Sequence, residues 1–223
     1  MTKNRSVFLD YSNTITTVES ENMAIEKWLS FIRDKYNLDQ GMNEKFLELR
    51  LKKLVERERN FKTFMEINRE VLNELYGIKE IYEEEYYRFH EKYLRLRDDF
   101  LPFMKEVKAT FSVVVVTDAD NIYTERTMRS LGIYDLFDCI VTAEDVKAPK
   151  PDRRIFEEAL RRSGYPEQVI FIGDSERRDI QGANNMNFLV IKMGDPSRDT
   201  AADFVATNFT EILKILEERG LLK

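Results

Sequence analysis

The chain has 223 residues, of which 43% are hydrophobic and 34% are charged, and its formal net charge is −6 at pH 7. This composition is typical of a folded globular protein, and the charges include no sustained basic run, so nucleic acid is not an expected partner. No apolar run approaches the roughly 20 residues that a membrane-spanning helix needs, and the N-terminus lacks the pattern of a signal peptide, so we expect a cytoplasmic protein without a membrane partner.

The first predicted strand is the apolar run VFLD at residues 7 to 10, which ends at Asp10. Taken alone, an aspartate after a strand is most often a turn or cap residue. Here Ser12, Asn13 and Thr14 follow, and asparagine adopts positive φ more readily than most residues. A turn at Asn13 lets successive backbone N–H groups face the same point as the Asp10 carboxylate. This pattern favours a ligand-binding site at Asp10 over an ordinary turn.

Residues 18 to 98 differ from the rest of the chain, because they contain no strand-like run and have four successive helical periodicities. We interpret them as an all-helical insertion. Asn43 is expected to cap the second helix and Gly77 to end the third. The aromatic residues of the fourth helix are expected to pack against the other helices.

Histidine and cysteine each occur once. His90 lies in the helical insertion, far from any catalytic motif, so histidine triads and multi-histidine metal sites are nearly excluded. Cys139 stands beside an apolar pair and has no second cysteine for a disulfide or a zinc site. We expect its thiol to be buried and inert.

Outside the insertion, short apolar runs alternate with helical patterns, which predicts an α/β core made of residues 1 to 17 and 99 to 223. The β-branched character of these runs is typical of parallel strands buried on both faces of a doubly wound, Rossmann-like sheet. The expected strands are residues 7 to 10, 111 to 118, 169 to 174 and 188 to 191. The expected helices lie near residues 121 to 131, 152 to 163, 177 to 186 and 210 to 219.

Polar side chains follow the predicted strands at their carboxyl ends, where an open α/β sheet binds its ligands. Thr117 and Asp118 end the valine-rich strand, and Asp174 ends the next one, with Asp179 about one helical turn further on. Together with Asp10, these last two carboxylates form a partial oxygen cage of the kind that Mg²⁺ accepts while keeping several waters.

Lys150 stands immediately before Pro151 and Asp152, which are expected to open a helix. A lysine near a helix start is unfavourable to the helix dipole. Its position therefore suggests an anionic ligand nearby rather than a contribution to the helix.

In chain order, these pieces resemble the four motifs of the haloacid dehalogenase superfamily: the loop from Asp10 to Thr14, the strand-end Thr117, the pair Lys150-Pro151, and the run GDSERRD at 173 to 179. The resemblance extends over the core and is densest at residues 131 to 183. In that family, a helical insertion between the first two motifs is a mobile cap. Residues 18 to 98 occupy that place, so the resemblance implies a hydrolase with an all-helical cap domain.

The resemblance also implies roles. Asp10 would be a nucleophile that forms an aspartyl ester, which water later hydrolyses, while Thr117 and Lys150 would hold the transferring group. The residues expected to contact a substrate phosphate are Tyr11, Ser12, Thr14 and Asp118. The residues expected to hold a Mg²⁺ cofactor are Asp10, Ser12 through its backbone carbonyl, Asp174 and Asp179. Closure of the cap would exclude water and select a small, phosphorylated substrate.

Ser12 departs from the family pattern, because phosphatases of the family carry a second aspartate at this position as general acid. A serine hydroxyl has no acidity near neutral pH, and general acid-base help is typically worth ~10²- to 10⁴-fold. Dehalogenases and phosphonate hydrolases of the family also lack that aspartate.

Three interpretations therefore stay open. One is a phosphatase whose leaving group needs little protonation or is protonated from the cap, which the retained pair Asp174 and Asp179 favours. The second is a hydrolase of carbon–halogen or carbon–phosphorus bonds. The third is a binding protein that kept the phosphate pocket without efficient turnover, and fold resemblance alone does not choose among them.

Overall fold

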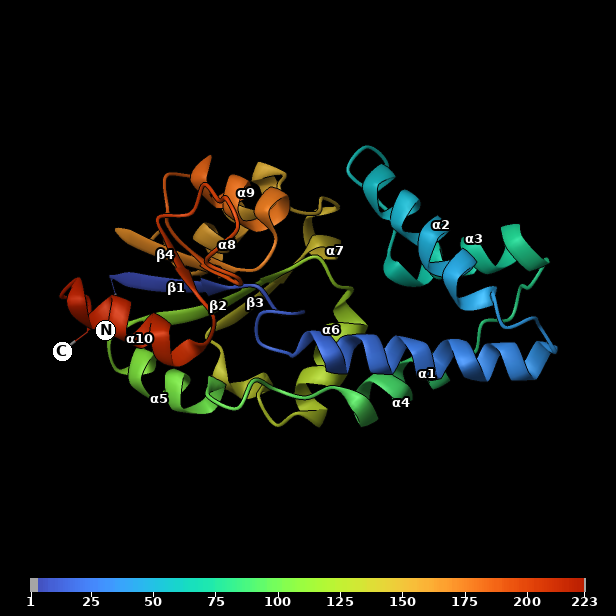
Figure 1. The fold of residues 1–223 in the computed structure, drawn as a ribbon. Helices are drawn as coiled ribbons and strands as arrows, with labels where there is room; N and C mark the ends of the chain where they lie inside the picture. The colour runs from blue at the N-terminus through green and yellow to red at the C-terminus, as the bar shows by residue number, and fades with distance from the viewer. Residues whose placement is uncertain (1–3, 223) are drawn as a thin grey trace.

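The computed structural model describes residues 4–222 and has a six-stranded parallel sheet with helices on both faces (Figure 1). The strand order is β3-β2-β1-β4-β5-β6, which confirms the predicted doubly wound α/β fold. The strands are β1 (Arg5–Leu9), β2 (Ser112–Thr117), β3 (Cys139–Thr142), β4 (Gln168–Gly173), β5 (Leu189–Met193) and β6 (Phe204–Ala206). Strands β3 and β6 were not predicted, because four and three half-buried residues leave little periodicity to detect.

Alternate residues of the central strands pack into two separate hydrophobic clusters, one on each face of the sheet. Val7 and its register partner Val113 belong to one cluster, whereas Phe8 and its partner Val114 belong to the other. All four side chains are fully buried. Burial on both faces explains why the valine-rich strand has no polar alternation.

Helices α5 and α10 cover one face of the sheet, and α8 and α9 cover the other (Figure 1). The core helices are α5 (Phe100–Thr110), α6 (Asn121–Ser130), α7 (Ala143–Val146), α8 (Arg153–Arg162), α9 (Gln181–Asn184) and α10 (Phe209–Glu218), with a 3-10 turn at Tyr134–Leu136. The predicted helices at 121 to 131, 152 to 163 and 210 to 219 are confirmed. Helix α5 was missed, although its buried residues Phe100, Phe103, Met104 and Val107 follow helical spacing.

The helix predicted at 177 to 186 is instead a π-helical turn, η2 (Glu176–Ile180), followed by the short α9. The Ile180 N–H donates to the Ser175 carbonyl (3.1 Å), and this longer spacing widens the turn. The Asp179 carboxylate folds back and accepts a hydrogen bond from the Ser175 N–H (2.9 Å). A Cβ on Gly173 would lie 2.5 Å from Asp179 Cγ, so the bare glycine lets Asp179 approach the end of β4.

The helical insertion consists of α1 (Val18–Tyr36), α2 (Met42–Glu56), α3 (Phe64–Tyr76) and α4 (Glu83–Tyr93). Gly77 ends α3 with φ of 67°, as predicted. The prediction for Asn43 was wrong, because α2 starts at Met42 after Gly41 and Asn43 lies inside its first turn. Trp28 packs edge-on against Phe46 and Tyr86, which places it in the hydrophobic core of the insertion.

The two connections between the insertion and the core run side by side. Thr16 and Leu96 form an isolated antiparallel bridge. Arg97 donates from Nε to the Thr14 carbonyl (3.0 Å) and from Nη2 to the Asn13 carbonyl (2.9 Å), so the returning connection is tied to the loop that follows Asp10. None of the helices in residues 4–222 combines the length and the apolar character needed to span a bilayer.

The Cys139 thiol is half-buried at the start of β3, and burial raises its pKa to about 11. At neutral pH it therefore stays protonated and a poor nucleophile.

Candidate active site

Three adjacent parallel strands bring the predicted site residues to one edge of the sheet. Asp10 follows β1, Thr117 ends β2 and Asp174 follows β4, and β1 pairs with both of the other strands. Asp10, Asp174 and Asp179 each offer a carboxylate oxygen, and these atoms lie within 4.8 Å of one another. Asp10 is far in the sequence from Asp174 and Asp179, and the topology brings all three to the switch point where α/β folds bind ligands.

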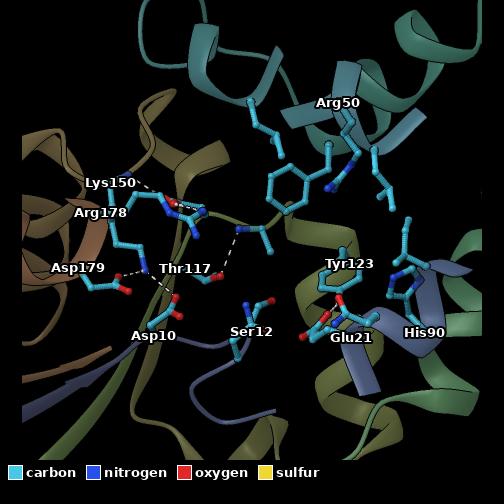
Figure 2. Close-up of a pocket in the computed structure, with 18 of the residues that line it drawn as sticks. Asp10, Ser12, Glu21, Arg50, His90, Thr117, Tyr123, Lys150, Arg178 and Asp179 are labelled. Carbon is cyan, nitrogen blue, oxygen red and sulfur yellow. Dashed lines mark hydrogen bonds and ion pairs between the residues drawn. The ribbon is translucent and has the colours of Figure 1, made fainter. Parts of the chain in front are cut away.

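Lys150 is the centre of the charge network at this edge (Figure 2). Its Nζ donates to Asp10 Oδ1 (2.6 Å) and to the Val116 carbonyl (3.0 Å), and it forms an ion pair with Asp179 Oδ1 (2.6 Å). The side chain is 2% exposed. Burial disfavours its charged form, but the attraction of Asp10 and Asp179 outweighs burial and raises the Lys150 pKa.

Burial raises the pKa of Asp10 to about 8, and repulsion from Asp179 and Asp174 acts in the same direction, while Lys150 opposes both. Thr14 Oγ1 donates to Asp10 Oδ2 (3.2 Å) and helps to orient it. Asn13 has φ of 65°, so the predicted left-handed turn after Asp10 is confirmed. The whole arrangement concentrates carboxylates that a single lysine does not fully balance.

The remaining predicted residues divide between the cavity and the core. Thr117 and Ser12 line the cavity. Asp118 also lines it, accepting from the Lys150 N–H at Oδ1 (2.7 Å) and pairing with Arg178 at 3.5 Å. The Tyr11 side chain points the other way, because it is fully buried and its hydroxyl donates to Thr127 Oγ1 (2.9 Å). Only the backbone of Tyr11 is therefore available to a ligand in this arrangement.

A cavity of about 270 Å³ lies between the carboxyl edge of the sheet and the helical insertion (Figure 2). Its helical wall contains side chains that the sequence did not identify as site residues. They are Glu21 of α1, Arg50 of α2 and His90 of α4, together with Tyr123 and Arg178 of the core. Arg178 lies inside the run GDSERRD, although no role was predicted for it. No local motif marks the other four, since each belongs to a helix whose inner face the sequence does not distinguish from a packing face.

Glu21 is held by three hydroxyl groups. Thr16 Oγ1 donates to its Oε1 (2.6 Å), the Tyr123 hydroxyl donates to its Oε2 (3.0 Å), and Ser12 is a third hydrogen-bonding partner. Enclosure raises the pKa of Glu21, and these hydrogen bonds oppose the shift. Ser12 therefore connects the Asp10 loop to the first turn of α1.

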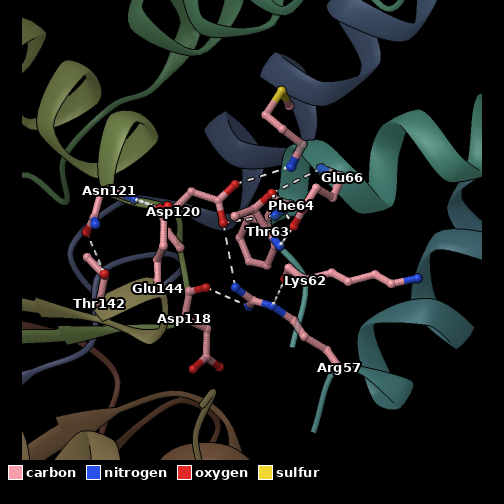
Figure 3. Close-up of polar contacts among 12 residues, drawn as sticks. Arg57, Lys62, Thr63, Phe64, Glu66, Asp118, Asp120, Asn121, Thr142 and Glu144 are labelled. Carbon is pink, nitrogen blue, oxygen red and sulfur yellow. Dashed lines mark hydrogen bonds and ion pairs between the residues drawn. The ribbon is translucent and has the colours of Figure 1, made fainter. Parts of the chain in front are cut away.

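The insertion and the core also meet around Arg57, just beyond the end of α2 (Figure 3). Arg57 Nη1 donates to the Asp118 carbonyl (2.7 Å), and Arg57 Nη2 lies 3.6 Å from Asp120 Oδ1. Asp120 accepts hydrogen bonds from the Phe64 N–H (2.9 Å) and the Met65 N–H (3.2 Å) at the start of α3. A core carboxylate thus satisfies the first N–H groups of a helix in the insertion.

Over residues 16–193, the chain matches the family model described as haloacid dehalogenase-like hydrolase. The chain belongs to this family. It is 34% identical over 102 residues to the glyceraldehyde 3-phosphate phosphatase of Methanothermobacter thermautotrophicus, and the match covers 45% of each chain. The chain spans about half the length of the curated relatives it matches.

Two solved structures share the haloacid dehalogenase-like (HAD) fold over nearly the whole chain. The HAD phosphatase of Thermococcus onnurineus is 23% identical with a TM-score of 0.76, and the match covers 95% of this chain and 97% of that one. The HAD hydrolase YfnB of Bacillus subtilis, in a magnesium-bound form, is 21% identical with a TM-score of 0.78 and coverages of 96% and 98%. At these identities the likeness is one of fold.

Proposed function

We propose that the protein is a magnesium-dependent phosphatase of small phosphorylated molecules that works through an aspartyl-phosphate on Asp10. The observation that carries the proposal is the convergence of Asp10, Asp174 and Asp179 within 4.8 Å, with Lys150 bound to the first and third. The relative named as a phosphatase and the retained acidic pair favour this activity over dehalogenation.

The donor set fits a divalent cation. Asp179 Oδ1 is buried and accepts no hydrogen bond, although it pairs with Lys150, so it has capacity for a further positive partner. We propose Asp10, Asp174, Asp179 and the Ser12 carbonyl as the ligands, an all-oxygen set of the type that Mg²⁺ prefers. When bound, the cation would neutralise charge on the transferring phosphate.

The chain's own residues account for the remaining chemistry. An Asp10 carboxylate oxygen attacks phosphorus, the ester P–O bond breaks, and the leaving oxygen takes the electron pair and a proton from solvent. Lys150, Thr117 and the backbone N–H groups after Asp10 hold the phosphate oxygens as their charge increases. Water then cleaves the aspartyl phosphate, which releases phosphate and restores the Asp10 carboxylate.

Residues 18 to 98 would act as a cap that closes over the phosphate and excludes water. Because Ser12 cannot donate a proton as a carboxylic acid does, we expect the enzyme to favour acyl or aryl phosphates, whose leaving groups need little protonation.

The test is release of phosphate from p-nitrophenyl phosphate by the purified protein, with Mg²⁺ and with EDTA. Turnover should require the metal and should vanish in Asp10→Asn, while the exposed-surface variant Asp195→Asn keeps wild-type activity. Release of halide from 2-chloropropionate in the presence of EDTA, without phosphatase activity, would instead identify a dehalogenase.

A further inference from the structure

Arg50 is the cation of the helical wall, and it faces the cavity from α2, opposite the Asp10 edge (Figure 2). Two contacts hold it in place. Its Nε donates to Oδ1 of the fully buried Asn68 on α3 (2.9 Å), and its guanidinium carbon lies 5.3 Å from the centre of the Phe64 ring. With Nε occupied, the two terminal nitrogens are the groups left to meet a ligand.

The other cavity cations already have carboxylate partners. Lys150 is paired with Asp10 and Asp179, and Arg178 is paired with Asp118. Within residues 4–222, Arg50 has no carboxylate within the 4.0 Å of an ion pair. Glu21 is the acidic group of the same wall, and hydroxyl donors occupy both of its oxygens.

An oriented guanidinium without a carboxylate partner, in a cavity wall, is a recognition group for an anion. The wall offers one unpaired positive charge beside the acidic Glu21. A single planar carboxylate matches that charge and the fork of the guanidinium, whereas a second phosphate dianion would exceed it.

We infer that Arg50 binds a carboxylate of the substrate, so that among phosphates with comparable leaving groups the enzyme prefers those that carry a carboxylate at the end opposite the phosphate. The inference rests on the proposed phosphatase activity. It predicts a preference different from that in the name of the Methanothermobacter relative, because the aldehyde of glyceraldehyde 3-phosphate carries no charge.

The experiment compares kcat/KM for 3-phosphoglycerate, which has the carboxylate, with that for glycerol 3-phosphate, which has an alcohol in its place. The wild type should prefer 3-phosphoglycerate, and Arg50→Gln should lower kcat/KM for it by ~10- to 100-fold, the value of a hydrogen bond to a charged group. Hydrolysis of glycerol 3-phosphate should change by less than about twofold, because that substrate does not use the contact. Arg50→Lys should recover only part of the loss, since an ammonium lacks the bidentate fork.

Arg59→Gln is the matched control, an exposed arginine just past α2, and it should behave as wild type on both substrates. An equal loss on both substrates in Arg50→Gln, or a wild type without preference for the carboxylate, overturns the inference while leaving the phosphatase proposal standing. Absence of turnover on every phosphate ester defeats the phosphatase proposal instead. In that case, calorimetric titration with 3-phosphoglycerate still tests the inference, using the Asp10→Asn protein with and without Arg50→Gln. The inference predicts weaker binding in the double variant, and an unchanged affinity overturns it.

Discussion

The strand-end wall of the cavity, where Asp10 follows β1 and Thr117 ends β2, gathers its carboxylates around Lys150. The helical wall, within residues 4–222, leaves Arg50 without a carboxylate partner and keeps His90 neutral. Buried side chains that several short contacts hold keep a fixed geometry, which suits chemistry that is the same for every phosphate substrate. Groups that await a ligand suit recognition. On our proposals, the sheet carries the reaction and the insertion chooses the substrate.

The largest expected effect is on the strand-end wall. Replacing Lys150 with methionine removes the buried cation between Asp10 and Asp179. We expect kcat on p-nitrophenyl phosphate to fall by about 10³-fold, because a preorganised charge that stabilises the transition state is lost. Lys105→Met, an exposed lysine of α5, serves as the control and should keep wild-type kcat. Retention of more than a tenth of the activity would contradict the role of Lys150.

The contacts of Arg57 with Asp118 and Asp120, which join the insertion to the core, should contribute to stability rather than to chemistry. Arg57 is 2% exposed, contacts the Asp118 carbonyl and lies 4.6 Å from the centre of the Phe64 ring. Arg57→Met leaves the buried Asp120 without its cationic neighbour, so we expect the free energy of unfolding in urea to fall by about 3 kcal/mol. The exposed Arg59→Met should cost less than about 0.5 kcal/mol. Equal losses of stability in the two variants would contradict the proposal that the contacts of Arg57 stabilise the protein.

On the helical wall, His90 should make stability depend on pH. Burial lowers its pKa to about 4, although its ring Nδ1 contacts the Tyr86 carbonyl (2.7 Å). An unfolded histidine has a pKa near 6.5. Between pH 6.5 and 4 the unfolded state therefore binds a proton that the folded state does not bind, which favours unfolding. The contribution of neutral His90 to the free energy of unfolding is complete above pH 6.5. It is lost as the pH falls toward 4, and the total loss is about 3 kcal/mol.

Urea unfolding of the wild type and His90→Gln at pH 7 and pH 4.5 measures this contribution by difference. The wild type should lose more stability than the variant. Since the chain has one histidine, its imidazole NMR signal reports the same pKa directly. A titration near pH 6.5 would show that the ring is accessible to water and would count against an enclosed helical wall.

The smallest expected effect concerns Ser12, which lies between the walls. Ser12→Asp supplies a carboxylic acid near the leaving group, so kcat/KM on glycerol 3-phosphate should rise by ~10-fold or more, and by less on p-nitrophenyl phosphate, whose leaving group needs little protonation. Ser12→Asn, of similar size but without acidity, should bring no such gain. Equal changes on both substrates would remove our explanation of the missing acid.

The fold and the strand-end wall could be predicted from the sequence, because their signals are local. The β-branched run at residues 111 to 118 predicts a buried strand. Asp10 and Asp174 directly follow strands, and Lys150 lies three residues before α8. Asn13 was predicted in the left-handed region and Gly77 at the end of the third helix, and both predictions are confirmed, since these preferences belong to the residue itself.

Only the tertiary structure decided which side chains form the helical wall and how the turn at Asp179 is built. Arg50, Glu21 and His90 come from three helices, and a periodic pattern shows that a helix has an inner face without showing what that face meets. The π-helical turn that carries Asp179 was likewise missed, because it depends on the fit of this side chain against Gly173. Local preferences set the strands and turns, whereas packing between distant segments set the composition of the cavity.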